Sequence, residues 1–171
     1  MKISKEFDAI VGFAREEAMR TGSYSIEADH LFLGILRHGS NSAVEVLRAL
    51  GIDIQGCKSE IDTLVFREQG IPYGREDDVR LGREGSNTVS LAIAEAMSEG
   101  ADETGPLHLL KAIFKQESSR SSEYLRRRGL SARDFGPKRE GRQKCATQVG
   151  ESELALLLSS INLNTNKTIV S

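Results

Sequence analysis

The sequence predicts an all-α fold, built as a tandem pseudo-twofold repeat of two four-helix units. Two observations predict it. Apolar residues recur with the helical period of about 3.6 residues along most of the chain, and residues 7–57 align without a gap on residues 85–135. The shift of 78 residues gives 14 identities in 51 positions, where ordinary residue usage would give roughly three by chance. A duplicated helical unit is the simplest explanation.

The strongest part of the repeat is the segment 30–36, His-Leu-Phe-Leu-Gly-Ile-Leu, which returns at 108–114 as His-Leu-Leu-Lys-Ala-Ile-Phe. A side chain that recurs at equivalent places in two repeats usually serves the fold. We therefore expect His30 and His108 to form hydrogen bonds where each of these helices begins, rather than to act in catalysis or metal binding.

Composition narrows the class of protein. The 171 residues are 39% hydrophobic and 28% charged, with a formal charge of −2, which is ordinary for a soluble globular protein and argues against nucleic acid as the main partner. No apolar run approaches the ~20 residues that span a bilayer, and the N-terminus lacks the apolar core of a secretory signal. Cys57 and Cys145 fit neither a disulfide framework nor a metal site. The expectation is a cytoplasmic protein without cofactor, metal or membrane partner.

The first helix of the first repeat is expected to start after Ser4, whose hydroxyl can cap it, and to end at Gly22. Its apolar residues share one face; they are Phe7, Ile10, Val11, Ala14 and Ala18. In the second helix Gly34 would permit close approach by a neighbouring helix.

Two further helices complete the first repeat. Ser42 and Glu45 are spaced as a capping box at the start of the third helix, which Gly51 would end. The fourth helix is expected to turn one face inward, formed by Ile54, Cys57, Ile61, Leu64 and Val65. On that face Cys57 is expected to be a small core residue rather than a reactive thiol.

The predicted organisation is a first repeat over 1–69, a linker over 70–85, a second repeat over 86–135 and a flexible tail over 136–171, with a short helix near 151–161. Glu76, Asp77 and Asp78 in the linker are expected to be a solvated loop. The first helix of the second repeat is expected to bury Val89, Ala92, Ala96 and Met97. Cys145 lies in this tail and is expected to be exposed, and therefore reactive.

No constellation of nucleophile, base and orienting group stands out, so an enzyme is not expected. The repeat instead resembles the Clp repeat domain, the N-terminal domain of the Clp/Hsp100 unfoldases, over residues 4–135. That resemblance implies a domain that receives substrates and docks adaptor proteins. A Gly-x-x-x-x-Gly-Lys-Ser/Thr phosphate loop does not occur in the sequence, so the chain is similar to stand-alone Clp N-domain proteins, some of which are accessory subunits of a Clp protease. A truncated unfoldase is the other interpretation.

The resemblance also implies candidate binding residues. Family members that bind phosphorylated arginine use a Glu just before the signature His of each repeat, and Asp29 and Leu107 occupy those positions here. Only Asp29 could accept guanidinium hydrogen bonds. Where the family has Phe-Thr at a substrate-contacting surface, this chain has Phe7 and Asp8.

Two hypotheses follow. The first is a non-catalytic interaction module whose partners are Clp ATPase or protease subunits, adaptor proteins or unfolded clients. The alternative is a sensor of a cationic ligand or modified residue, held by Asp29 at the surface between the repeats. A nucleic-acid binder using the triplet 126–128 ranks third.

Overall fold

The computed structural model describes residues 1–67 and 69–136. The helix predicted near 151–161 and Cys145 lie outside these residues. The elements of the described part are, in chain order, β1 (Lys2–Ile3), α1 (Lys5–Thr21), β2 (Ser25–Ile26), α2 (Ala28–His38), α3 (Ser42–Ala49), α4 (Ile54–Val65), the 3₁₀ turn η1 (Glu76–Asp78), β3 (Arg80–Leu81), α5 (Arg83–Ser98), β4 (Glu103–Thr104), α6 (Pro106–Lys115), α7 (Arg120–Arg127) and the 3₁₀ turn η2 (Ala132–Phe135).

The elements obey the 78-residue shift. The helices α5, α6 and α7 begin 78 residues after α1, α2 and α3, and η2 begins 78 residues after α4. Two pairs of glycines with positive φ follow the same rule, Gly22 with Gly100 and Gly51 with Gly129. The predicted all-α double repeat is confirmed, although the fourth element of the second repeat is a 3₁₀ turn rather than a full α-helix.

Two short parallel strand pairs join the repeats, and the sequence pattern did not predict them. Strand β1 pairs with β4, and β2 pairs with β3. Each pair therefore joins the strand before the first helix of one repeat to the strand before the second helix of the other. Strand β3 and the start of α5 fall within the segment 70–85 that the sequence predicts to be a linker.

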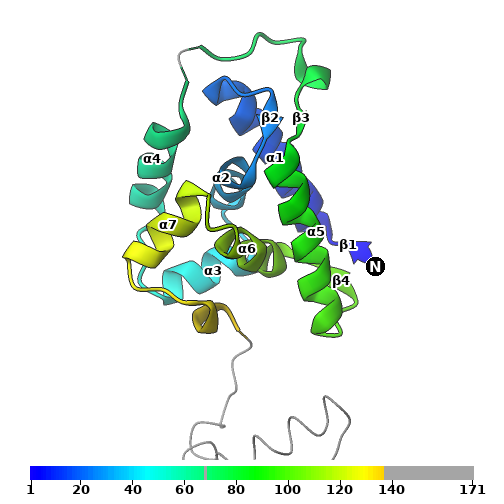
Figure 1. Ribbon diagram of the computed structural model, residues 1–171, viewed down its shortest axis with the longest axis vertical. Helices are drawn as coiled ribbons and strands as arrows, with labels where there is room; N and C mark the ends of the chain where they lie inside the picture. The colour runs from blue at the N-terminus through cyan, green and yellow to red at the C-terminus, as the bar shows by residue number, and fades with distance from the viewer. Residues whose placement is uncertain (68, 137–171) are drawn as a thin grey trace, which may run out of the picture. The chain divides into compact units, whose positions relative to one another are not determined.

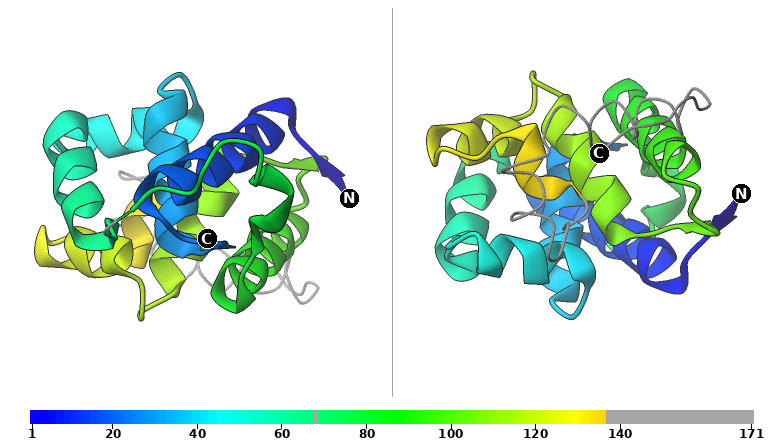
Figure 2. Two further views of the ribbon diagram at one scale, coloured as in Figure 1. Left: turned by 90° about the horizontal axis from the view of Figure 1, so that it is seen from above. Right: turned by 90° about the horizontal axis from the view of Figure 1, so that it is seen from below.

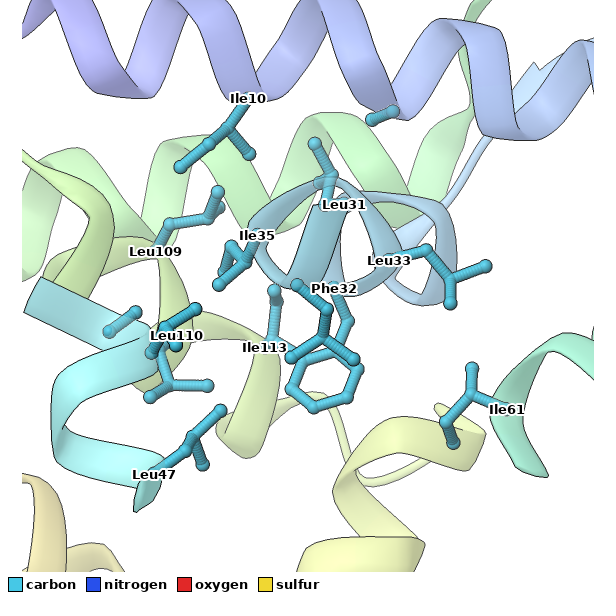
Figure 3. Packing of buried hydrophobic residues seen from close by; sticks show 14 of the residues in the cluster. Ile10, Leu31, Phe32, Leu33, Ile35, Leu47, Ile61, Leu109, Leu110 and Ile113 are labelled. Carbon is cyan, nitrogen blue, oxygen red and sulfur yellow. The ribbon is translucent and has the colours of Figure 1, made fainter. Parts of the chain in front are cut away.

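The signature helices α2 and α6 lie at the centre of the described unit (Figures 1 and 2), with α1 packed mainly on α2 and α5 mainly on α6. Figure 3 shows their apolar side chains converging with those of α1, α3 and α4. Gly34 permits the close approach that the sequence predicts, because a Cβ there would lie 2.6 Å from the carbonyl oxygen of Ile10.

Three details differ from the sequence expectation. Helix α3 is capped by Asn41, whose side chain accepts a hydrogen bond from the Val44 amide, because Asn41 is the last extended residue and Ser42 is already helical. Leu64 and Met97 were expected in the core but are exposed. In α4 the residue that continues the buried face is Val65, and in α5 it is Ala96. Leu64 and Met97 each lie one residue from these positions, which turns their side chains by about 100° around the helix axis.

Candidate functional site

Three carboxylates meet where the helices α2, α5 and α7 begin, and we call this group, Glu27, Asp29 and Glu84, the acidic junction. Glu27 directly precedes α2, yet its Oε1 accepts a hydrogen bond of 2.9 Å from the Gly85 amide of α5. Glu84 belongs to α5, yet its Oε1 accepts one of 3.3 Å from the Ala28 amide of α2. The two helices thus cap each other across the repeats.

Asp29 does the same for α7. Its Oδ1 accepts hydrogen bonds from the Ser121 amide at 2.8 Å and the Ser121 hydroxyl at 2.7 Å, and its Oδ2 accepts one from the Arg120 amide at 3.3 Å. A carboxylate that accepts first-turn amides satisfies donors which have no partner within the helix, and it opposes the partial positive charge of the helix N-terminus. Each member of the acidic junction therefore stabilises a helix other than its own.

Glycines make the mutual capping of α2 and α5 sterically possible. A Cβ on Gly82 would lie 2.0 Å from the Glu27 Oε2, and a Cβ on Gly85 would lie 2.0 Å from the carbonyl oxygen of Ile26. Both distances are far below van der Waals contact. The start of α5 therefore approaches Glu27 this closely only because these two residues lack side chains.

On the other side of the pseudo-twofold, Glu27 and Asp29 have no acidic counterpart, whereas Glu84 corresponds to Glu6. The 78-residue shift replaces Glu27, Asp29 and Ser121 by residues whose side chains form no hydrogen bond. Pro106, the counterpart of Ala28, also lacks the amide N–H that Ala28 donates to Glu84. The pairs are Glu27 with Gly105, Ala28 with Pro106, Asp29 with Leu107 and Ser121 with Ala43. The asymmetry that the sequence indicates at Asp29 and Leu107 thus extends to the capping residue Glu27 and to Ser121.

A surface cavity of about 580 Å³ opens at the acidic junction, and we call it the junction cavity. Three apolar side chains on its wall are exposed to solvent: Tyr24, Leu64 and Phe66, the last with 52% of its surface accessible. Arg67 and Arg120 also line it. The cavity therefore combines an apolar wall with charges of both signs. The full lining is Gly22 to Ser25, Glu27, Asp29, His30, Leu64 to Arg67, Glu84 and Arg120.

The signature histidines hold the backbone where their helices begin, as the sequence predicts. His30 Nδ1 accepts a hydrogen bond of 3.0 Å from the Glu27 amide, and His108 Nδ1 accepts one of 2.9 Å from the Gly105 amide. Burial lowers the pKa of His30 below its ordinary 6.5, because the charged ring loses hydration. At neutral pH the proton of the His30 ring is therefore on Nε2.

The predicted site residues are separated. Asp29 lies at the acidic junction, whereas Phe7 is in the core with 2% of its surface exposed and Asp8 is on the exposed side of α1. Neither Phe7 nor Asp8 lines the junction cavity. In this conformation Phe7 supports the fold and offers no apolar surface to a partner, because its position on α1 belongs to the buried stripe.

Sequence reasoning missed Glu27 and Glu84. The signal for Glu84 was its position in the first turn of a helix, where acidic residues favour the dipole. Nothing in the one-dimensional pattern, however, indicates that its partner would be another helix 56 residues away. That arrangement arises only when the repeats pack.

Other chemistry is scarce in the described residues. Cys57 is buried, and burial raises the pKa of its thiol to about 12, which fits the predicted core role. Within residues 1–67 and 69–136, no three His, Cys, Asp or Glu side chains are arranged so that they could hold a metal ion. The same residues contain no helix with both the length and the apolar character needed to cross a membrane.

Comparison with known proteins identifies relatives. The family model described as the Clp repeat (R) N-terminal domain matches residues 2–131. The negative regulator of genetic competence ClpC/MecB of Bacillus subtilis is 23% identical over 165 residues, covering 96% of this chain and 19% of that protein. The chain thus spans about a fifth of the length of this relative.

Solved structures agree on the fold. The N-terminal domain of ClpD from Arabidopsis thaliana matches with a TM-score of 0.61 at 15% identity, over 78% of this chain and 92% of that one. The Hsp104 N-terminal domain from Candida albicans matches with a TM-score of 0.63 at 12% identity, over 79% and 87%.

Proposed function

This chain belongs to the family of Clp repeat N-terminal domains, and from that premise we propose that it is a non-catalytic interaction module, an accessory or regulator of a Clp chaperone–protease. Its partners would be Clp ATPase or protease subunits, adaptor proteins or unfolded clients. The relatives carry this domain as a small part of a longer chain, so a role for the domain itself is proposed and not the activity of the whole relative.

The observation that carries the proposal is the junction cavity. Its wall exposes Tyr24, Leu64 and Phe66 beside an acidic junction whose hydrogen bonds hold α2, α5 and α7 in place. Exposed apolar side chains with a polar surround are typical of protein-interaction surfaces. A rigid frame also limits the entropy lost when a partner binds. We therefore place the partner on the face of the domain that contains this cavity.

A lysate experiment tests the proposal. The tagged full-length chain is used to capture partners from the native lysate, and Clp subunits are quantified by mass spectrometry. The variant Phe66→Ser should recover several-fold fewer Clp subunits. Met97→Ser is the matched control, because Met97 is a similarly exposed apolar residue, 62% accessible, that does not line the cavity. Failure of the unmodified chain to recover any Clp subunit or polypeptide client would overturn the proposal.

The alternative of a cationic or phosphoarginine-like ligand draws on the three carboxylates beside the cavity. Each of them, however, already accepts at least one backbone hydrogen bond, so a guanidinium would compete with helix capping. Titration of arginine and phosphoarginine against the chain and its Asp29→Ala variant tests it. Equal affinities, or none, would remove the alternative.

A further inference from the structure

The two signature histidines differ in what surrounds their second ring nitrogen. His108 Nε2 lies 3.2 Å from the Glu99 Oε1, and the other oxygen of Glu99 pairs with Lys111. Burial opposes ionisation of Glu99, but Lys111 and His108 outweigh it and hold the pKa of Glu99 below its ordinary value. In the second repeat the histidine therefore donates to an ionised carboxylate of the same chain.

The first repeat lacks that carboxylate. The residue 78 positions before Glu99 is Thr21, whose hydroxyl donates to the Glu17 and Ala18 carbonyl oxygens. Among residues 1–67 and 69–136, His30 Nε2 has no hydrogen-bond partner, and His30 lines the junction cavity. The Nε2 donor of the signature histidine thus has an acceptor, Glu99, in the second repeat, whereas in the first repeat the histidine lines a cavity.

Two arginines and the helix N-termini offset the negative charge of the acidic junction at the cavity. Each junction carboxylate caps a helix N-terminus, which carries a partial charge of about +0.5. Arg67 and Arg120 line the same cavity, and neither forms an ion pair with another described residue. The three carboxylates and two guanidinium groups give the lining a formal charge of −1, which the capped helix N-termini offset in part, and the hydrogen-bond donors at the cavity include His30 Nε2.

We propose that the junction cavity binds a carboxylate of a polypeptide at His30 Nε2, in the place that Glu99 occupies beside His108, with the neighbouring apolar side chain of that polypeptide against Tyr24, Leu64 or Phe66. The inference rests on the proposed role in polypeptide binding and names the feature that is recognised. The carboxylate can come from a chain end or from an acidic side chain, because the donors contact the same group in both.

Three labelled peptides distinguish these sources. The first, acetyl-Gly-Leu-Phe-Leu, has a free C-terminal carboxylate; the second is its C-terminal amide; the third is acetyl-Gly-Leu-Phe-Glu amide. Their affinities for the full-length chain are measured by fluorescence anisotropy. A peptide with a carboxylate should bind about tenfold more tightly than the plain amide, the usual effect of a hydrogen bond to a charged group. The first and third peptides then show which source is preferred.

The matched variants are His30→Asn and His108→Asn. Asparagine can keep an acceptor near the place of Nδ1 but removes the Nε2 donor, so His30→Asn should bring all three peptides to the affinity of the amide. His108→Asn should leave the preference for a carboxylate intact. Equal binding of acid and amide peptides by the unmodified chain would overturn this inference alone. If none of the three peptides binds, the inference is overturned as well. The proposed function is then judged by the lysate capture alone.

Discussion

Asp29 on α2 accepts a hydrogen bond of 2.7 Å from the hydroxyl of Ser121 on α7, so the Asp29 carboxylate links the first repeat to the second. The equivalent pair on the other side is Leu107 and Ala43. One contact of the pseudo-twofold is therefore polar and its counterpart has apolar residues, and the junction cavity opens beside the polar contact.

Replacing Asp29 by Ala should lower the free energy of unfolding by about 1–2 kcal/mol, the usual cost of losing a helix N-terminal cap together with a buried hydroxyl partner. Urea denaturation measures it. Asp77→Ala, in the exposed turn η1, is the control and should change little. The double variant Asp29→Leu with Ser121→Ala reproduces the Leu107 and Ala43 pair of the other side. Its loss of unfolding free energy should be smaller than the sum of the losses in the single variants Asp29→Leu and Ser121→Ala. Simple additivity would contradict this account of the contact.

Gly34→Ala should destabilise the protein by about 1–3 kcal/mol through overpacking, because the new Cβ would meet the Ile10 carbonyl oxygen at 2.6 Å. The comparison is Gly12→Ala in α1, where nothing lies within 4 Å of the new Cβ. At that position the better helix propensity of alanine should raise the free energy of unfolding by about 0.5–1 kcal/mol. Chemical denaturation of both variants checks the prediction, and changes of the same sign would contradict it.

Thr104→Val should raise the thermal stability. Within the described residues, the Thr104 hydroxyl is a buried oxygen without a hydrogen-bond partner, and such a group costs about 1–3 kcal/mol. The equivalent residue of the first repeat is apolar, Ile26. Thr21→Val is the control, because the Thr21 hydroxyl donates to the Glu17 carbonyl oxygen at 2.7 Å and its removal brings no such gain. Calorimetry on both variants would reveal a contradiction if Thr104→Val melted lower.

The pKa of His30 predicts how stability depends on pH. Burial lowers this pKa below its ordinary value of 6.5, so between the folded and unfolded values the unfolded chain binds more protons. The free energy of unfolding should therefore fall as the pH drops below about 6.5. Denaturation from pH 7.5 to 5 measures the slope, which should be shallower in His30→Asn. An unchanged slope would show that other groups cause the dependence.

The sequence predicted the repeat, its helices and the role of the signature histidines because each depends on local periodicity or on a contact within three residues. It also located the asymmetry at Asp29. It could not predict that Asp29 accepts hydrogen bonds from residues about 90 positions away, or that Glu27 and Glu84 cap each other's helices. These contacts exist only after two similar units have packed, and the sequence pattern within each unit is silent about the other.

The interaction role is tested most directly by hydrogen–deuterium exchange on the full-length chain, alone and saturated with the Clp ATPase recovered in the lysate capture. Binding at the junction cavity predicts slower exchange of the amides in residues 22–30, 64–67 and 118–122, with α3 and the start of α6 unchanged. Protection confined to α3 and α6, or no protection in any segment at saturation, would contradict it.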